Sequence, residues 1–188
     1  LRLPYEQIRP FKAYEPVMIG SLAIQAFPKF HDANDPHSFL ISCDGVHTGV
    51  FTDIGACCEH LITHFKQCHA AILEANYDED MLHNGRYPYH LKKRISGGHG
   101  HLSNRQALEL YLAHKPAQLS HLLLAHLSKE NNSPELVQAL FDAHAGQTKI
   151  IVATRYEETP VYHIQATTKT EAIKVKYKAP KAVQATLF

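Results

Sequence analysis

Short apolar runs alternate with segments of helical periodicity along most of this chain. Runs rich in β-branched, aromatic and leucine residues predict strands at residues 18–30, 38–43, 46–52, 70–74, 120–127, 149–155 and 161–164. Helices are expected at residues 56–68, 78–83, 89–94, 103–114 and from Ser133 onward. Strands and helices that alternate in this order predict an α/β layered fold.

Turn and capping residues mark several of these boundaries. Asp44-Gly45 lies between two apolar runs and predicts a tight hairpin. Ser103 or Asn104 can cap the helix that follows, because either side chain can accept a hydrogen bond from a free backbone amide. Ser133-Pro134 predicts another helix start, since proline is favoured in the first turn.

The composition fits one compact domain with a substantial hydrophobic core. The chain has 188 residues, of which 45% are hydrophobic, and a formal net charge of +1. Its apolar runs are far shorter than the roughly 20 residues that cross a bilayer. The four cysteines show no CxxC spacing, and nothing at the amino end resembles a signal peptide. We therefore expect a soluble, cytoplasmic protein with reduced thiols and no zinc ribbon.

Histidine is abundant, and one histidine ends a candidate buried strand. The chain contains 15 histidines, and the apolar run 122–125 is followed directly by His126. Open α/β sheets bind ligands at the carboxyl ends of their strands, and imidazole is a common metal ligand. A metal-dependent hydrolase is therefore the first hypothesis, whereas most of the other histidines are expected to be solvated surface side chains.

Basic residues gather in two places. Arg86, Lys92, Lys93 and Arg94 precede residues 100–104, and the chain from residue 169 onward carries five lysines against one acid. Either group can contact phosphates or be a solvated surface. The second group predicts a basic tail at 165–188, separate from a domain at 1–164.

Several spaced motifs occur in the order found in one fold family. They are Phe30-His31-Asp32-Ala33, Phe51-Thr52-Asp53, Leu73-Glu74-Ala75-Asn76-Tyr77-Asp78, Met81-Leu82, Tyr87-Pro88, Gly100-His101-Leu102-Ser103-Asn104 and Ala125-His126-Leu127-Ser128. Together they resemble the metallo-β-lactamase fold, and within it the WalJ/YycJ-like branch that is related to ribonuclease Z and ribonuclease J. The resemblance implies an αββα sandwich, of which this chain holds mainly the carboxyl-terminal half, a β-sheet flanked by helices.

The same resemblance implies a site for two divalent metal ions, zinc or manganese, that activate water for attack on a phosphodiester. His31 and His126 match metal-ligating histidines, and Asp53 matches the aspartate that bridges both metals. His101 matches a histidine expected near the scissile phosphate, so His101 and Asp53 are the implied catalytic residues. Neutral imidazole and carboxylate are ligands that both metals accept.

One part of the family pattern is missing from the chain. The HxHxDH motif, which supplies several metal ligands in the family, does not occur in these 188 residues. We therefore expect the sequence to be a carboxyl-terminal portion of a longer protein. Because metal affinity depends on ligand number and a preformed geometry, the chain alone is expected to bind metal poorly, if at all, and to be inactive.

The resemblance implies a DNA exonuclease linked to repair. Two alternatives remain open: a non-catalytic nucleic-acid-binding module, and a hydrolase of small esters or thioesters on the same fold. At the carboxyl end, Gln184, Leu187 and Phe188 resemble the QxxLF pentapeptide that docks on bacterial sliding clamps. An exposed leucine and phenylalanine can anchor in an apolar pocket, and packing of these residues on their own domain is the alternative.

Overall fold

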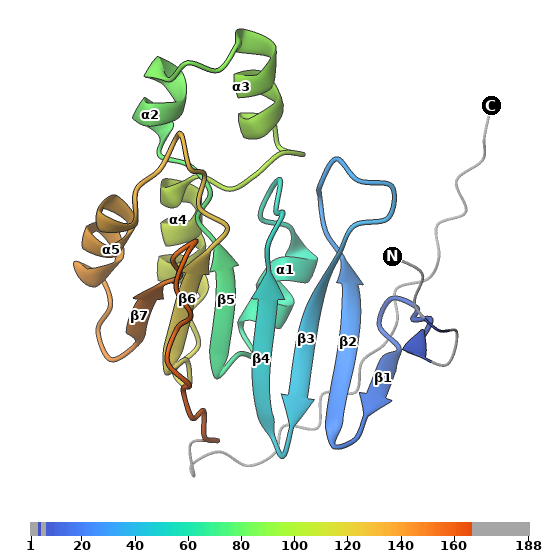
Figure 1. The fold of residues 1–188 in the computed structure, drawn as a ribbon. Helices are drawn as coiled ribbons and strands as arrows, with labels where there is room; N and C mark the ends of the chain where they lie inside the picture. Colours follow the sequence, from blue (N-terminus) through green and yellow to red (C-terminus); the bar gives the residue numbers. More distant parts are fainter. Residues whose placement is uncertain (1–3, 5–6, 167–188) are drawn as a thin grey trace, which may run out of the picture.

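One seven-stranded sheet, with its strands in chain order, forms the centre of the molecule (Figure 1). The computed structural model describes Pro4 and residues 7–166. The strands are β1 (Pro16–Ile19), β2 (Leu22–Pro28), β3 (His37–Cys43), β4 (Val46–Phe51), β5 (Ala70–Glu74), β6 (His121–Ala125) and β7 (Lys149–Val152). The strands from β1 to β4 pair antiparallel, and those from β4 to β7 pair parallel.

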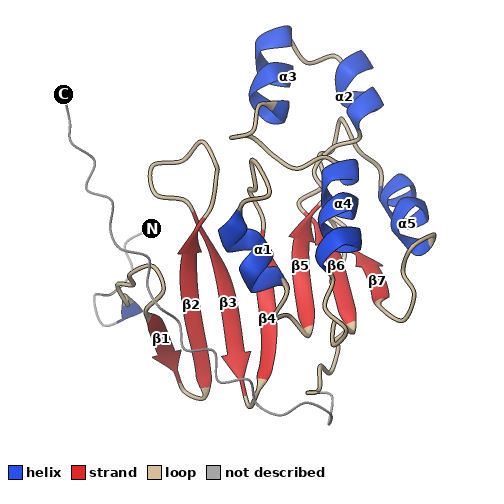
Figure 2. Ribbon diagram, turned by 180° about the vertical axis from the view of Figure 1, so that it is seen from behind, coloured by secondary structure: helices blue, strands red, loops and turns tan. Residues whose placement is uncertain are grey.

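The helices cover one face of the sheet and extend beyond one edge. Helices α1 (Glu59–Phe65), α4 (Asn104–His114) and α5 (Pro134–Asp142) lie on the face that is turned to the viewer in Figure 2. Helices α2 (Glu79–Asn84) and α3 (Tyr89–Ser96) stand beyond the carboxyl ends of β5 and β6 (Figure 1). Parallel neighbours need crossover connections, and the helices supply them. In the described part of the chain, no helix is long and apolar enough to cross a membrane.

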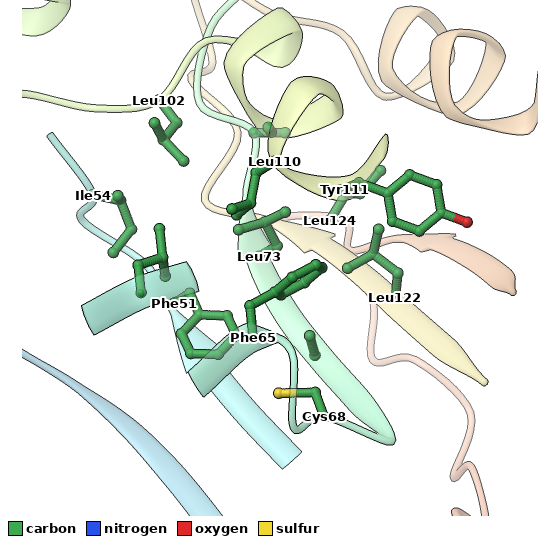
Figure 3. Packing of buried hydrophobic residues seen from close by; sticks show 14 of the residues in the cluster. Phe51, Ile54, Phe65, Cys68, Leu73, Leu102, Leu110, Tyr111, Leu122 and Leu124 are labelled. Carbon is green, nitrogen blue, oxygen red and sulfur yellow. The ribbon is translucent and has the colours of Figure 1, made fainter. Parts of the chain in front are cut away.

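The hydrophobic core lies between the sheet and these helices (Figure 3). Phe51, Leu73 and Leu124 are fully buried and sit in register on three adjacent parallel strands. Phe65 from α1 and Tyr111 from α4 close over them, both fully buried. This burial fixes the parallel strands against one another, because removing apolar surface from water is the main driving force of folding. The same packing also fixes the carboxyl ends of β4, β5 and β6.

Most of the elements predicted from the sequence are confirmed, with bounds that differ by a few residues. The Asp44-Gly45 hairpin forms, with φ angles of 48° and 78°, as a two-residue hairpin turn with both central residues left-handed requires. Ser103 caps α4 by accepting a hydrogen bond from the Gln106 N–H, and the Gln106 side chain accepts one from the Ser103 N–H. Ser133 caps α5 in the expected way.

Two predicted elements were wrong. The single strand expected at 18–30 is a hairpin, because Gly20 adopts a φ of 59° and turns the chain between β1 and β2. Residues 161–164 form no strand; Tyr162 instead packs its ring on His121 beneath Lys149. Most of the expected basic tail, with Gln184, Leu187 and Phe188, lies outside the described residues.

The core packing predicts different costs for two leucines of α4. Leu110 is 3% exposed and Leu112 is 48% exposed. Leu110→Ala is expected to lower the free energy of unfolding by about 2 to 5 kcal/mol, because it leaves a cavity among buried side chains. Leu112→Ala removes the same atoms from the helix surface and is expected to cost less than about 1 kcal/mol. Urea unfolding measures both, and equal losses would contradict the packing described here.

Candidate metal centre

Three acidic or imidazole side chains stand at the carboxyl ends of adjacent parallel strands. Asp53 follows β4, Glu74 ends β5 and His126 follows β6. The parallel pairing of these strands brings their ends to one edge of the sheet, where α/β folds place their ligands. His31 and His101 reach the same place from the loops after β2 and α3. Five side chains from distant parts of the chain therefore converge.

Glu74 lies at the centre of this group. Its side chain is 0% exposed, and Oε1 accepts hydrogen bonds from Nδ1 of His101 at 2.7 Å and Nδ1 of His126 at 2.6 Å. Oε2 accepts from the backbone N–H groups of Ile54 at 2.6 Å and Leu102 at 3.3 Å. The carboxylate thus has four donors, which is its full capacity. We therefore regard Glu74 as a residue that positions the histidines, although it lies within the cluster of possible ligand atoms.

Hydrogen bonding keeps the Glu74 carboxylate charged. Burial by itself would raise the pKa of Glu74, but the hydrogen bonds from His101, His126 and the Ile54 N–H outweigh it, so its pKa lies below the ordinary value. The hydrogen bond to Glu74 in turn raises the pKa of His126, against the effect of burial. The two side chains form a charge-assisted pair, in which Glu74 is buried and the His126 side chain is 42% exposed.

Each histidine is oriented through its Nδ1 atom. A carboxylate can only accept, so Nδ1 of His101 and of His126 carries hydrogen. Nδ1 of His31 likewise donates to the backbone carbonyl of Gly100, at 2.9 Å. In the neutral ring, Nε2 is then the free nitrogen. Metal-binding histidines usually show this arrangement, in which the other ring nitrogen donates to a carboxylate or carbonyl.

The residues that the sequence analysis expected in the site come together in the structure. Oδ1 of Asp53 lies 3.7 Å from Nε2 of His31 and 3.7 Å from Nδ1 of His126. The ring centroid of His101 lies 5.3 Å from that of His31 and 5.2 Å from that of His126. Asp53, Glu74, His101 and His126 each offer one possible ligand atom, and these four atoms lie within 4.8 Å of one another. The donor set therefore fits a divalent metal.

Two of these residues have strained backbones. Asp53 and His126 have φ angles of 54° and 61°, a left-handed conformation that non-glycine residues seldom adopt. Hydrogen bonds stabilise both turns: Asn76 Nδ2 donates to the His126 carbonyl at 2.7 Å, and Lys29 Nζ donates to the Thr52 carbonyl at 2.6 Å. Burial lowers the pKa of Lys29, and the nearby carboxylates of Asp53 and Glu74 oppose that shift. Strain of this kind is characteristic of functional sites.

Glycine is required where the loop of His101 passes the end of α3. A Cβ atom on Gly100 would clash with the backbone carbonyls of Ile95 and Arg94. The close approach lets the Gly100 carbonyl accept from His31 and lets the His101 N–H donate to the Ile95 carbonyl at 2.8 Å. The glycine of this motif therefore sets the position of two histidines.

An ion pair joins α3 to the loop of His31. The Arg94 guanidinium donates to Asp32, and this contact holds the pKa of the Asp32 carboxyl below its ordinary value. The other Asp32 oxygen lies 3.6 Å from Nε2 of His31. Arg94, one of the four basic residues between positions 86 and 94, thus places a positive charge beside the site. Lys92 of the same cluster instead donates to the His83 carbonyl.

Sequence reasoning missed three residues that shape the site: Glu74, Lys29 and Asn76. Glu74 carried a usable signal, because it is a charged residue that directly ends an apolar strand. Lys29 and Asn76 carried none, since both act on carbonyl groups that only the folded chain brings to them.

Glu74→Gln is expected to lower the free energy of unfolding by about 2 to 4 kcal/mol, because the new amide NH₂ faces buried donors. The exposed Glu109→Gln on α4 is the control.

In metal-free protein, the folded pKa of Glu74 is below 4.5 and that of His126 is above 6.5. The Glu74 contribution is lost as pH falls below about 4.5, and that of charged His126 is lost as pH rises above about 6.5. Urea unfolding across pH should show the largest gap between wild type and Glu74→Gln within this window, and a pH-independent gap would contradict it.

Comparisons with known proteins agree with this geometry. No protein-family model matches the chain. The chain is 29% identical over 136 residues to exodeoxyribonuclease YycJ of Bacillus anthracis, covering 72% of this chain and 52% of YycJ. It is 32% identical over 117 residues to exodeoxyribonuclease WalJ of Streptococcus pneumoniae, covering 62% of this chain and 44% of WalJ. The chain thus spans about half the length of the curated relatives it matches.

Solved structures share the fold at low sequence identity. The metallo-β-lactamase fold protein YhfI from Bacillus subtilis superposes with a TM-score of 0.58 at 15% identity, over 76% of this chain and 51% of YhfI. Zn²⁺-bound PqqB from Methylobacterium extorquens superposes with a TM-score of 0.55 at 15% identity, over 76% of this chain and 52% of PqqB. This chain therefore has the metallo-β-lactamase fold and is related in sequence to the WalJ and YycJ exodeoxyribonucleases.

Proposed function

We propose that this chain supplies part of a metal-dependent phosphodiesterase that removes nucleotides from the end of DNA. The observation that supports the proposal best is the cluster at the strand ends, in which the histidine Nδ1 atoms are bound and the Nε2 atoms are free for a metal. The relatives YycJ and WalJ are exodeoxyribonucleases, which favours DNA as the substrate.

His31, Asp53 and His126 would hold the metal. Asp53 would bridge two divalent ions, as the resemblance implies; its Oδ1 lies 3.7 Å from a nitrogen of each of the other two residues, and its side chain is 39% exposed. When bound, such ions lower the pKa of a water and offset the charge that builds up on phosphoryl oxygens. Zinc and manganese both accept these ligands.

His101 would act on the leaving group. Its Nδ1 donates to the Glu74 carboxylate, so a protonated ring carries its second hydrogen on Nε2. His101 lines the same pocket as His126 and Arg94. A protonated imidazole there can give its Nε2 proton to the departing oxygen while the carboxylate keeps the ring in place.

The surroundings of the site favour a phosphate-bearing substrate over a neutral ester. Arg94, Lys129 and Arg155 line the pocket that contains His101 and His126. Three cations around one pocket, of which Arg94 is paired with Asp32, complement the negative charge of a nucleic-acid backbone, whereas a neutral ester or thioester offers Lys129 and Arg155 no negative charge. A non-catalytic nucleic-acid-binding module would also use these cations. A measurement of DNA degradation is therefore needed to distinguish such a module from a phosphodiesterase.

We propose further that the site needs ligands beyond those of this chain. The side chains that the resemblance assigns to metal binding are three, and two-metal sites use more. The 188 residues alone are therefore expected to bind Zn²⁺ or Mn²⁺ weakly and to show no turnover. A fusion that adds an HxHxDH segment at the amino end is expected to degrade DNA.

Asp53→Asn and His126→Ala test this function. Each removes a proposed ligand and is expected to weaken Zn²⁺ or Mn²⁺ binding more than about tenfold, measured by equilibrium dialysis with the 188-residue chain. The same changes in the fusion are expected to abolish release of nucleotides from end-labelled single-stranded DNA.

Asp80→Asn and His90→Ala are the matched controls, since both side chains are exposed on the lobe formed by α2 and α3. They should leave metal binding and DNA degradation unchanged. Equal metal affinity in all four variants would contradict the assigned ligands. Binding of DNA by the fusion without any degradation would favour the non-catalytic module instead.

We also propose a sliding clamp as a partner, on the strength of Gln184, Leu187 and Phe188 alone. Deletion of residues 184–188 is expected to abolish capture of the chain by an immobilised bacterial clamp, because the apolar anchors are lost. Surface plasmon resonance measures the effect, with Lys181→Ala as the control. Unchanged capture after the deletion would exclude the motif.

A further inference from the structure

Two pockets meet at the loop that carries His126. The histidine pocket, of about 430 Å³, contains His101 and Arg94. The side pocket, of about 370 Å³, lies next to it and is lined by Leu127, Pro134 and Tyr156. The two pockets share a wall made of residues from the His126 loop and the segment after β7: His126, Leu127, Ser128, Lys129 and Arg155.

The shared wall is positively charged. Lys129 and Arg155 line both pockets, and Arg155 is held on the wall by a hydrogen bond from its Nη2 to the Leu127 carbonyl at 3.0 Å. Among the described residues that line the side pocket there is no carboxylate. In the histidine pocket, the only lining acid of the described residues is Asp32, which is paired with Arg94. An anion on the shared wall would meet Lys129 and Arg155. Because the carboxylates of Glu74 and Asp53 lie 2.6 Å and 3.7 Å from His126 of the same wall, the two cations, and not His126, are the partners for an anion.

The side pocket also presents an aromatic ring on a fixed turn. Tyr156 is 80% exposed, so one of its ring faces is open to a ligand. The turn is ordered by Thr154, whose Oγ1 donates to the Glu157 carbonyl and accepts from the Glu157 N–H, each at 3.1 Å. The preceding Ala153 N–H donates to the Leu124 carbonyl at 2.8 Å and so fixes the segment to β6. The backbone that carries Tyr156 is consequently fixed beside the His126 loop, with the exposed ring among the residues that line the side pocket.

We propose that the side pocket binds the nucleotide next to the scissile phosphodiester. Its base stacks on Tyr156, and its phosphate contacts Arg155 and Lys129 on the wall shared with the histidines. An aromatic face combined with cations is how proteins hold single-stranded nucleic acid without reading its sequence. A volume of about 370 Å³ lies in the range of about 300–1,000 Å³ typical of small-molecule sites and suits a single nucleotide.

This assignment rests on the proposed function and gives it a substrate subsite. Because stacking on a tyrosine accepts any base, the subsite implies degradation that does not depend on sequence. Because the pocket takes one unpaired base, it also implies preference for a single-stranded end over a duplex.

Binding of thymidine 5′-monophosphate to the 188-residue chain tests the subsite without metal or turnover. NMR titration in the presence of a chelator measures its dissociation constant, and thymidine and inorganic phosphate are titrated in parallel.

Tyr156→Ala is expected to weaken binding of the nucleotide at least about fivefold and to leave binding of inorganic phosphate unchanged, because only stacking is lost. Tyr156→Phe should restore the wild-type affinity. Arg155→Gln is expected to weaken both the nucleotide and inorganic phosphate and to leave thymidine unchanged.

Tyr89→Ala and Arg105→Gln are the matched controls. Tyr89 is 78% exposed on α3 and Arg105 is exposed on α4, and neither residue lines the two pockets. The urea midpoint of each variant confirms that it folds. Equal nucleotide affinities in Tyr156→Ala and wild type, or no saturable nucleotide binding, would overturn the subsite. Metal binding by Asp53→Asn and His126→Ala is measured separately, so failure of the proposed function and failure of the subsite give different results.

Discussion

A buried, fully hydrogen-bonded carboxylate determines the structure of this site. Ionised Glu74 is costly to bury, and the cost is offset only because two imidazoles and two backbone amides donate to it. Those donors come from the segments after β4, α3 and β6, so Glu74 also ties three chain segments together at one edge of the sheet. Leu73, immediately before Glu74 in β5, belongs to the hydrophobic core and fixes the strand that carries the carboxylate. Core and site are therefore one physical unit.

The parallel half of the sheet was predictable from the sequence, and the antiparallel half less so. Runs such as 70–74 and 122–125 are short and apolar, apart from Glu74 at the end of the first, and turn or cap residues mark the helices between them. The division of residues 18–30 into β1 and β2 depends on the left-handed φ of Gly20, which an apolar pattern does not show. The strand expected at 161–164 failed because an apolar run needs a partner strand, and Tyr162 packs on a ring and a lysine instead.

The residues of the candidate site also differ in how far the sequence predicted them. His31, Asp53, His101 and His126 lie in sequence motifs, and the structure brings all four together, although their chemical roles stay proposals. Glu74 lay inside a motif and received no role, because its role depends on donors 20 to 52 positions away in the chain. Lys29 and Asn76 bind backbone carbonyls, and no side-chain pattern indicates which carbonyl a folded chain will present.

The two walls of the histidine pocket are held by forces of different kinds. Helix α3 buries none of its residues, and Arg94 links it to Asp32 through an exposed ion pair. Ions in solution screen such a contact, whereas they screen the contacts of the fully buried Glu74 carboxylate with its histidines less. Rising ionic strength should consequently loosen the α3 side of the pocket while the imidazoles keep their places. The width of the pocket entrance would then change with salt concentration, whereas the arrangement of the ligands would not.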